Sequence, residues 1–184
     1  MCIFKHLGYA MDPRRIHVAG GKNKLLARIP HIQSAARFSR WVVLVDLDQD
    51  AECAPGYREL LPSSPPPGCL VRIAVRALES WLLADAQGLS NYLRVPRKEV
   101  PAQPDLLNDP KREIIRLAQK SSAHRIIQDM VPRPGSGRPV GQLYVPRMSY
   151  FMNNLWNIDA AINSSESLLR CVNDLEPFLR TDLW

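Results

Sequence analysis

The sequence predicts an α/β fold with a mainly parallel sheet, followed by a helical C-terminal half. The uninterrupted apolar run at residues 42–45 is typical of a strand buried on both faces of a parallel sheet. A second apolar run at residues 70–75 leads into a helical pattern, and this order favours right-handed crossovers between parallel strands. After residue 95 the chain changes character, because proline-rich connections alternate with helical patterns.

Residues 1–95 are predicted to form the α/β core, in which glycine and proline mark the ends of the elements. The predicted elements are a strand over residues 15–19, a helix over 22–28 that breaks at Pro30 and resumes over 32–38, the central strand over 41–45, an exposed loop over 54–68, a strand over 70–75, and a helix over 77–93 that Gly88 would allow to break.

Residues 96–184 are predicted to form a helical region packed on this core. Asp109 can cap a helix and Pro110 suits its first turn. The predicted segments are a helix over residues 111–120, one or two turns over 124–130, a flexible loop over 132–139, and helices over 146–155 and 165–179. Leucine and valine recur at helical spacing in the last helix, which indicates core packing and carries no functional signal.

Composition limits the class of protein. The chain has 184 residues, 46% of them hydrophobic, which is enough for one real core. No apolar run approaches the ~20 residues of a membrane span, so we expect a cytoplasmic protein without a membrane partner. The four cysteines include no Cys-x-x-Cys pair, which favours free thiols over a zinc site or disulfides.

Three alternating carboxylates, Asp46, Asp48 and Asp50, end the central strand. Open α/β sheets place ligands at the carboxyl ends of their strands. Carboxylates packed there repel one another unless a cation lies between them, and Mg²⁺ or Mn²⁺ takes oxygen ligands. The sequence therefore predicts a metal site in which Asp46 and Asp48 are the favoured ligands and Asp50 is a further candidate. The alternative is that Asp48 and Asp50 begin a solvated loop and Asp46 caps a nearby element.

Glu79 follows the next strand and could project from the same sheet edge. Its neighbours in sequence are mostly apolar, so its carboxylate would be partly desolvated and would need a cation or an arginine as partner. We predict that Glu79 is a further metal ligand and, with Asp46 and Asp48, a catalytic residue. The alternative is a structural ion pair with Arg72 or Arg76.

The net charge of +6 is unevenly distributed: eight basic residues and one acidic residue precede Asp46. Cations beside an acidic metal site suit a phosphodiester substrate. We therefore predict that Lys22, Lys24 and Arg28 bind the backbone of a nucleic acid, with Arg76 a weaker candidate. The alternative is that scattered arginines reflect genome composition and bind nothing in particular.

Together these motifs resemble a bacterial Toprim-like family of uncharacterised proteins. The resemblance covers most of residues 15–180 and is carried by Val-Asp-Leu-Asp-Gln-Asp at 45–50, Glu-Ser-Trp-Leu-Leu-Ala-Asp at 79–85 and Asn-Asp-Pro-Lys at 108–111. It implies a three-layer Toprim-like core, related to nucleases of the overcoming-lysogenisation-defect type. Some relatives are thought to lie beside ATPases in phage-defence loci, which implies an ATPase partner.

One departure concerns the first strand of a Toprim fold, which normally ends in a glutamate that acts as acid and base. This chain has no glutamate before Glu52, so we expect either a chain that is truncated or mis-started at its N-terminus, without that first strand, or a degenerate member. A missing strand would leave an open sheet edge. We predict that a homodimer or a folded-back N-terminal segment covers this edge through Ile3, Phe4, Leu7 and Tyr9, the alternative being an ordinary first helix on the core.

Two functions from different classes follow. The leading prediction is Mg²⁺- or Mn²⁺-dependent phosphoryl transfer on nucleic acid, most simply hydrolysis by a nuclease. The other is a non-catalytic Toprim-like subunit with an incomplete site, which works by docking an ATPase or another partner. The carboxylates favour the first function, and the missing glutamate favours the second.

Overall fold

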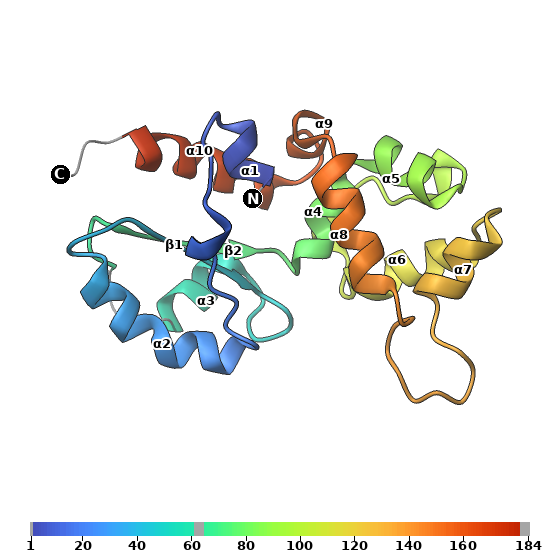
Figure 1. Ribbon diagram of the computed structural model, residues 1–184, viewed down its shortest axis with the longest axis horizontal. Coiled ribbons are helices and arrows are strands. Elements are labelled where there is room, and N and C mark those ends of the chain that lie inside the picture. The colour runs from blue at the N-terminus through green and yellow to red at the C-terminus, as the bar shows by residue number, and fades with distance from the viewer. Residues whose placement is uncertain (1, 61–64, 181–184) are drawn as a thin grey trace.

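Two parallel strands, β1 (Trp41–Asp46) and β2 (Cys69–Ala74), form the sheet of the computed structural model, which describes residues 2–60 and 65–180 (Figure 1). The strands pair in register from Trp41 opposite Cys69 to Asp46 opposite Ala74. Helices account for 55% of the structure. The predicted α/β class and both of these strands are therefore confirmed, whereas a Toprim-like core stays a prediction.

Helices cover both faces of this sheet. Because side chains alternate along a strand, Val43, Val45 and Val71 share one face, where they pack with Ile29 of helix α2 (Lys22–Ala35). Ala74 on the opposite face packs with residues of helix α10 (Glu166–Arg180). Figure 1 shows α10 above the sheet and α2 below it. The last helix of the chain thus completes the layers around strands from the first half.

Residues 82–151 share a single apolar cluster, which is built from helices and short 3-10 turns. The predicted boundary at residue 95 therefore runs through one core. The elements from here to α10 are α4 (Leu78–Ala84), α5 (Ala86–Leu93), η2 (Arg97–Glu99), η3 (Pro104–Leu106), α6 (Pro110–Gln119), α7 (His124–Met130), α8 (Tyr144–Asn154) and α9 (Ile158–Ile162).

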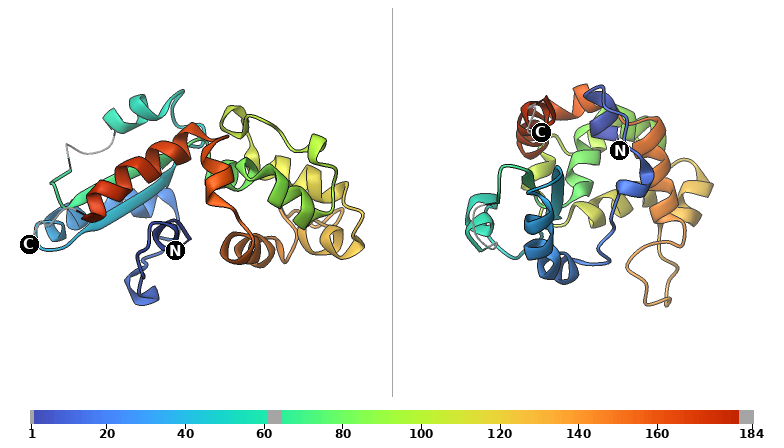
Figure 2. Two further views of the ribbon diagram at one scale, coloured as in Figure 1. Left: turned by 90° about the horizontal axis from the view of Figure 1, so that it is seen from above. Right: turned by 60° about the vertical axis from the view of Figure 1, so that its left-hand side comes forward.

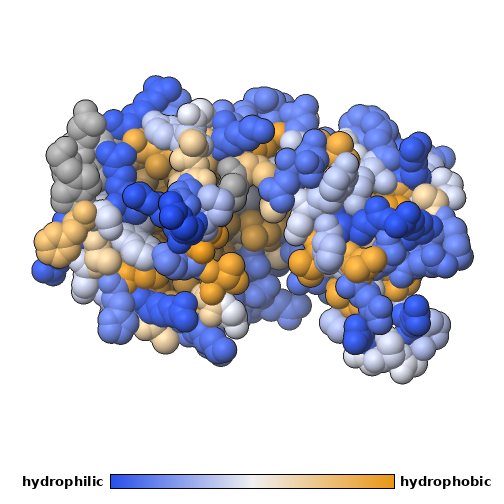
Figure 3. All heavy atoms as spheres, in the orientation of Figure 1, coloured by the Kyte–Doolittle hydropathy of each residue, from blue (hydrophilic) through white to orange (hydrophobic). Residues whose placement is uncertain are grey.

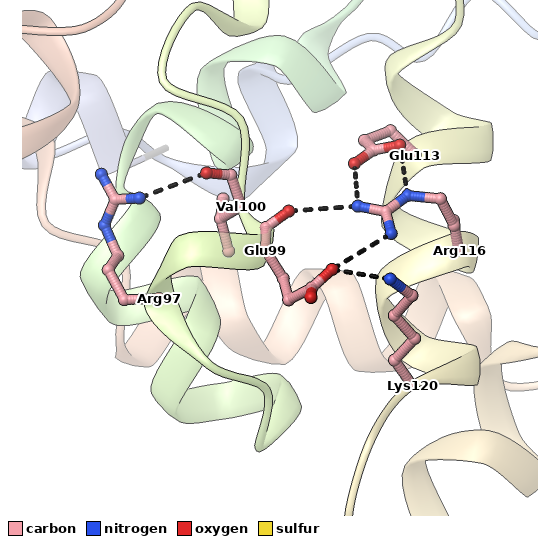
Figure 4. A network of polar contacts seen from close by, with 6 residues as sticks. All are labelled: Arg97, Glu99, Val100, Glu113, Arg116 and Lys120. Atoms are coloured by element: carbon pink, nitrogen blue, oxygen red, sulfur yellow. Dashed lines mark hydrogen bonds and ion pairs between the residues drawn. The ribbon is translucent and has the colours of Figure 1, made fainter.

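Arg116 ties η2 to α6 on the surface of this cluster (Figure 4). Its guanidinium binds Glu113 at 2.6 Å and donates to the carbonyl oxygen of Glu99 at 3.1 Å. Lys120 binds the Glu99 carboxylate at 2.7 Å, and this hydrogen bond is the main reason that the pKa of Glu99 is lowered. The network orients one turn against one helix.

The N-terminal segment differs from the prediction of a strand over residues 15–19. It contains helix α1 (Cys2–His6) and the 3-10 turn η1 (Pro13–Arg15), and no strand follows within residues 16–21. Val18 is 85% exposed, so a strand there would gain little from burial. The ring of His17 instead stacks on Trp41 with 5.5 Å between centroids.

Figure 2 shows this segment on the side of β1 that faces away from β2. Within residues 2–60, no backbone hydrogen bond joins the segment to β1. Ile3 and Leu7 pack against the apolar cluster around Trp81, as the alternative of an ordinary first helix on the core expects. The homodimer stays a prediction.

Three further details of the first half were predicted wrongly. Helix α3 (Ala54–Leu60) lies where an exposed loop was expected, because Tyr57 is buried against the sheet cluster. Helix α2 continues through Pro30, since burial of its apolar face outweighs the ~3 kcal/mol penalty of an internal proline. The break after α4 falls at Asp85 and not at Gly88. Residues 61–64 of the predicted loop lie outside the described residues.

The second half follows its prediction closely, apart from the short helix α9, which was not predicted. Asp109 accepts a hydrogen bond from the backbone of Arg112 and caps α6, with Pro110 in its first turn.

In the described part of the chain, no helix is long and apolar enough to cross a membrane.

Candidate functional site

A pocket of about 400 Å³ lies where the two strands end. One wall comes from the end of β1 and the loop after it, including Asp46, Asp48 and Asp50. The start of α6, with Lys111, also lines the pocket, as does Arg76, which follows β2. The structure thus brings four predicted site residues together. Glu79, Lys22, Lys24 and Arg28 are not among the residues that line the pocket.

Asp46 is the last residue of β1 and is half-buried. Its Oδ1 accepts a hydrogen bond of 3.0 Å from the backbone N–H of Leu78, the first residue of α4. The alternative that Asp46 caps a nearby element is therefore confirmed. Burial raises the pKa of the Asp46 carboxyl, the Leu78 hydrogen bond opposes this shift, and the charges of Asp48 and Glu79 add to it.

Replacing Asp46 with asparagine should increase stability more at neutral pH than at low pH. Because the pKa of Asp46 is raised above 3.8 on folding, the folded state binds more protons than the unfolded state just above that pH. The wild type therefore loses stability as pH rises through this window, whereas the amide of the Asp46→Asn variant keeps the acceptor for Leu78 and does not titrate. Urea unfolding at a series of pH values measures the difference.

The control for this experiment is Asp12→Asn. Asp12 is bound by Arg14, and that hydrogen bond lowers the pKa of its carboxyl. The stabilising effect of the Asp12 charge is therefore lost at low pH. Asp12→Asn should accordingly reduce stability more at neutral pH than at low pH, which is the opposite of the change expected for Asp46→Asn. A stability difference for Asp46→Asn that does not change with pH would contradict the burial argument.

Asp48 and Asp50 converge on one cation, the ammonium of Lys22. Lys22 Nζ lies 2.6 Å from Asp48 Oδ2 and 2.8 Å from Asp50 Oδ2. It also donates to the carbonyl oxygen of Leu47 at 3.3 Å and lies 5.5 Å from the centre of the Tyr57 ring. Burial by itself would lower the pKa of Lys22, but the two carboxylates outweigh it and raise the pKa. Lys22 thus stays charged and is the ion-pair partner of both Asp48 and Asp50.

The backbone places Asp48 for this contact. Asp48 has φ of +51°, a left-handed conformation that aspartate tolerates better than most residues. Its N–H donates to the carbonyl oxygen of Arg76 at 2.7 Å, which extends the strand pairing beyond β1. In return, the Arg76 guanidinium donates to the carbonyl oxygens of Asp48 and Ala51, both at 3.1 Å. Arg76 therefore positions the carboxylate loop.

Glu79 has neither of the partners that the alternative prediction gave it. Tyr144 donates its hydroxyl to Glu79 Oε1 at 3.3 Å, and Lys111 Nζ lies 3.4 Å from the same oxygen. Burial, followed by the nearby Glu79 charge, raises the pKa of Tyr144. Arg72 pairs instead with Asp174 of α10. Reasoning from the sequence missed Tyr144 and Lys111, although Lys111 belongs to the helix-start motif at 108–111.

The predicted metal site can be tested against these positions. Among residues 2–60 and 65–180, no group of three or more His, Cys, Asp or Glu side chains is placed to hold a metal. The pair Asp48 and Asp50 nevertheless converges on one positive charge, and two carboxylates suit Mg²⁺, which keeps several waters. Asp46 and Glu79 have other hydrogen-bond partners, and the Lys22 ammonium occupies the point on which Asp48 and Asp50 converge. A metal bound by Asp48 and Asp50 would have to displace Lys22, so the metal site stays a prediction.

The remaining predicted cations, Lys24 and Arg28, are exposed on α2. They extend the positive charge of Lys22 along the helix, outside the pocket.

Comparisons with family models, with curated proteins and with solved structures find no match to this chain. The similarity to a Toprim-like family therefore stays a prediction.

Proposed function

We propose that this protein is a Toprim-like phosphodiesterase that uses Mg²⁺ or Mn²⁺ to hydrolyse nucleic acid. The observation that carries the proposal is the convergence of Asp48 and Asp50 on a single cation, in a pocket at the carboxyl ends of parallel strands. The metal would take the place of the Lys22 ammonium. When bound, it would polarise the scissile phosphate and lower the pKa of a bound water.

The residues around the carboxylates suit a phosphodiester. Lys111 is half-exposed at the first turn of α6 and lines the same pocket as Asp48 and Asp50. The positive end of the α6 dipole adds to its charge. Lys22, once released from Asp48 and Asp50, would join Lys24 and Arg28 in binding the phosphate backbone. Arg76 keeps the loop in place through its backbone contacts.

Asp48→Asn should reduce metal-dependent cleavage by at least about 100-fold, because losing a ligand costs more than the 10–100-fold effect of losing a residue that only orients one. The assay follows plasmid and single-stranded DNA and RNA in Mn²⁺, and calorimetry measures Mn²⁺ binding to the same samples. Asp12→Asn, at a partly exposed aspartate outside the pocket, is the matched control. If the wild type and Asp48→Asn cleave equally, Asp48 does not hold the catalytic metal and the proposed site is wrong.

A second candidate function is a non-catalytic subunit that docks an ATPase in a cytoplasmic phage-defence system. The observation that favours it is that protein groups already bind these carboxylates: Lys22 pairs with both Asp48 and Asp50, while Lys111 and Tyr144 bind Glu79. A folded wild type that neither binds Mn²⁺ nor cleaves nucleic acid would support this function over hydrolysis.

A further inference from the structure

The loop between α7 and α8 concentrates positive charge on an exposed segment. Residues 132–139, Pro-Arg-Pro-Gly-Ser-Gly-Arg-Pro, are here called the arginine loop, and Arg133 and Arg138 lie near its two ends. The sequence contains no acidic residue between Asp129 and Asp159. The positive charge of the loop is therefore not offset by carboxylates nearby in the sequence.

The base of the arginine loop is fixed. Gly141 N–H donates to the carbonyl oxygen of Met130 at 2.9 Å, and Leu143 N–H donates to that of Asp129, also at 2.9 Å. A Cβ on Gly141 would lie only 2.5 Å from the Asp129 carbonyl oxygen, so the two ends of the loop approach each other closely. Arg147 of α8 binds the Asp129 carboxylate at 2.8 Å. The loop is thus presented from a rigid base.

The two loop arginines differ from Arg147 in having no protein partner. Within the described residues, neither the Arg133 nor the Arg138 guanidinium has a hydrogen bond or an ion pair. Figure 3 shows the loop projecting at the lower right of the molecule, with a pale tip of intermediate hydropathy. The loop contains no aromatic or long aliphatic side chain that could insert into a lipid surface. Exposed arginines without such anchors suit phosphate groups.

The arginine loop lies on the same side of the molecule as the exposed cations of α2. Figures 1 and 2 show the arginine loop and α2 projecting toward the same side of the molecule. Lys24 and Arg28 are exposed on α2, and the start of α6 lines the pocket. A polyanion that follows this side could therefore contact both sets of cations. A nucleic acid has the length and the regular phosphate spacing to do so.

We propose that the arginine loop is a second binding site for the phosphate backbone of nucleic acid, with Arg133 and Arg138 each contacting phosphate. The choice of nucleic acid as the ligand rests on the proposed function. Binding to the arginine loop, however, requires neither a metal nor cleavage. The prolines limit the freedom that the loop loses on binding, while Gly135 and Gly137, with φ of +75° and +64°, allow its tight turn.

Fluorescence anisotropy with labelled duplex DNA, without metal, tests the proposal at a series of salt concentrations. In the double variant Arg133→Ala/Arg138→Ala, the slope of log K against log salt should fall in magnitude by about 1.8, since each phosphate contact contributes about 0.9. Arg133→Lys/Arg138→Lys should restore the slope because it keeps both charges. Circular dichroism verifies that each variant is folded.

The matched control is Arg170→Ala/Arg180→Ala on α10, which removes the same charge from residues paired with Glu166 and Glu176. An equal loss of slope in this control would show a nonspecific effect of net charge and overturn the proposal. An unchanged slope in the loop variant would also overturn it, as would loop-dependent binding to phosphatidylserine vesicles without binding to DNA.

The same experiments distinguish this inference from the proposed function. Loop-dependent DNA binding without metal-dependent cleavage would support the binding site and contradict the hydrolase. Cleavage that depends on Asp48, with DNA binding that does not depend on the loop, would support the hydrolase and contradict the binding site.

Discussion

Replacing Lys22 with methionine should raise the affinity of the protein for Mn²⁺ by about tenfold or more. Lys22 donates two charge-assisted hydrogen bonds to Asp48 and Asp50, and a metal must displace both. Such bonds contribute about 1.5–3 kcal/mol when buried, but the two carboxylates are about half exposed, so we take the lower end of that range. About 1.4 kcal/mol corresponds to a tenfold change in affinity.

Isothermal titration calorimetry with Mn²⁺ measures this change. Methionine keeps an unbranched apolar side chain and removes the ammonium, together with its hydrogen bonds and its contact with the Tyr57 ring. Lys24→Met is the matched control, because it removes the same charge from an exposed position on the same helix. If Lys22→Met and the wild type bind Mn²⁺ equally, the Lys22 ammonium does not occupy the metal position.

The Lys22 experiment also bears on the choice between the two proposed functions. A metal-dependent enzyme needs the internal ammonium to leave Asp48 and Asp50 when the metal binds. A non-catalytic subunit would use the same ion pairs to fix the loop after β1. In that case Lys22→Met should destabilise the fold without creating a metal site.

Replacing Asp85 with alanine should lower the free energy of unfolding by about 3 kcal/mol. Asp85 is only 2% exposed, and its two oxygens serve different elements. Oδ1 accepts from Gly88 N–H at 2.9 Å and caps α5, whereas Oδ2 accepts from Asn157 N–H at 2.8 Å, at the start of α9. Alanine would leave both N–H groups without these acceptors, at about 1–3 kcal/mol each.

Urea unfolding followed by circular dichroism measures the Asp85 effect. Asp159→Ala is the matched control, since the Asp159 side chain is 80% exposed and its loss should change stability by about 0.5 kcal/mol or less. A similar small effect at both positions would show that the paired N–H groups find other acceptors, and would contradict a structural role for Asp85.

The sequence by itself determined the elements that depend on local patterns. The apolar runs of β1 and β2 predict buried strands because few other structures accommodate such runs. Asp109 and Pro110 predict the start of α6 because capping involves only the neighbouring turn. The carboxylates after β1 were placed at the sheet edge for the same reason, since they follow the strand directly.

Only the tertiary structure decided how the side chains of the site are paired. Lys22 meets Asp50 across 28 positions in sequence, Tyr144 meets Glu79 across 65, and the Asn157 backbone meets Asp85 across 72. These contacts depend on how helices pack on the sheet and on one another, and no local spacing encodes them. Many charged partners compete for each carboxylate in the sequence. Packing leaves only a few within hydrogen-bonding distance, and those few decide how each carboxylate is paired.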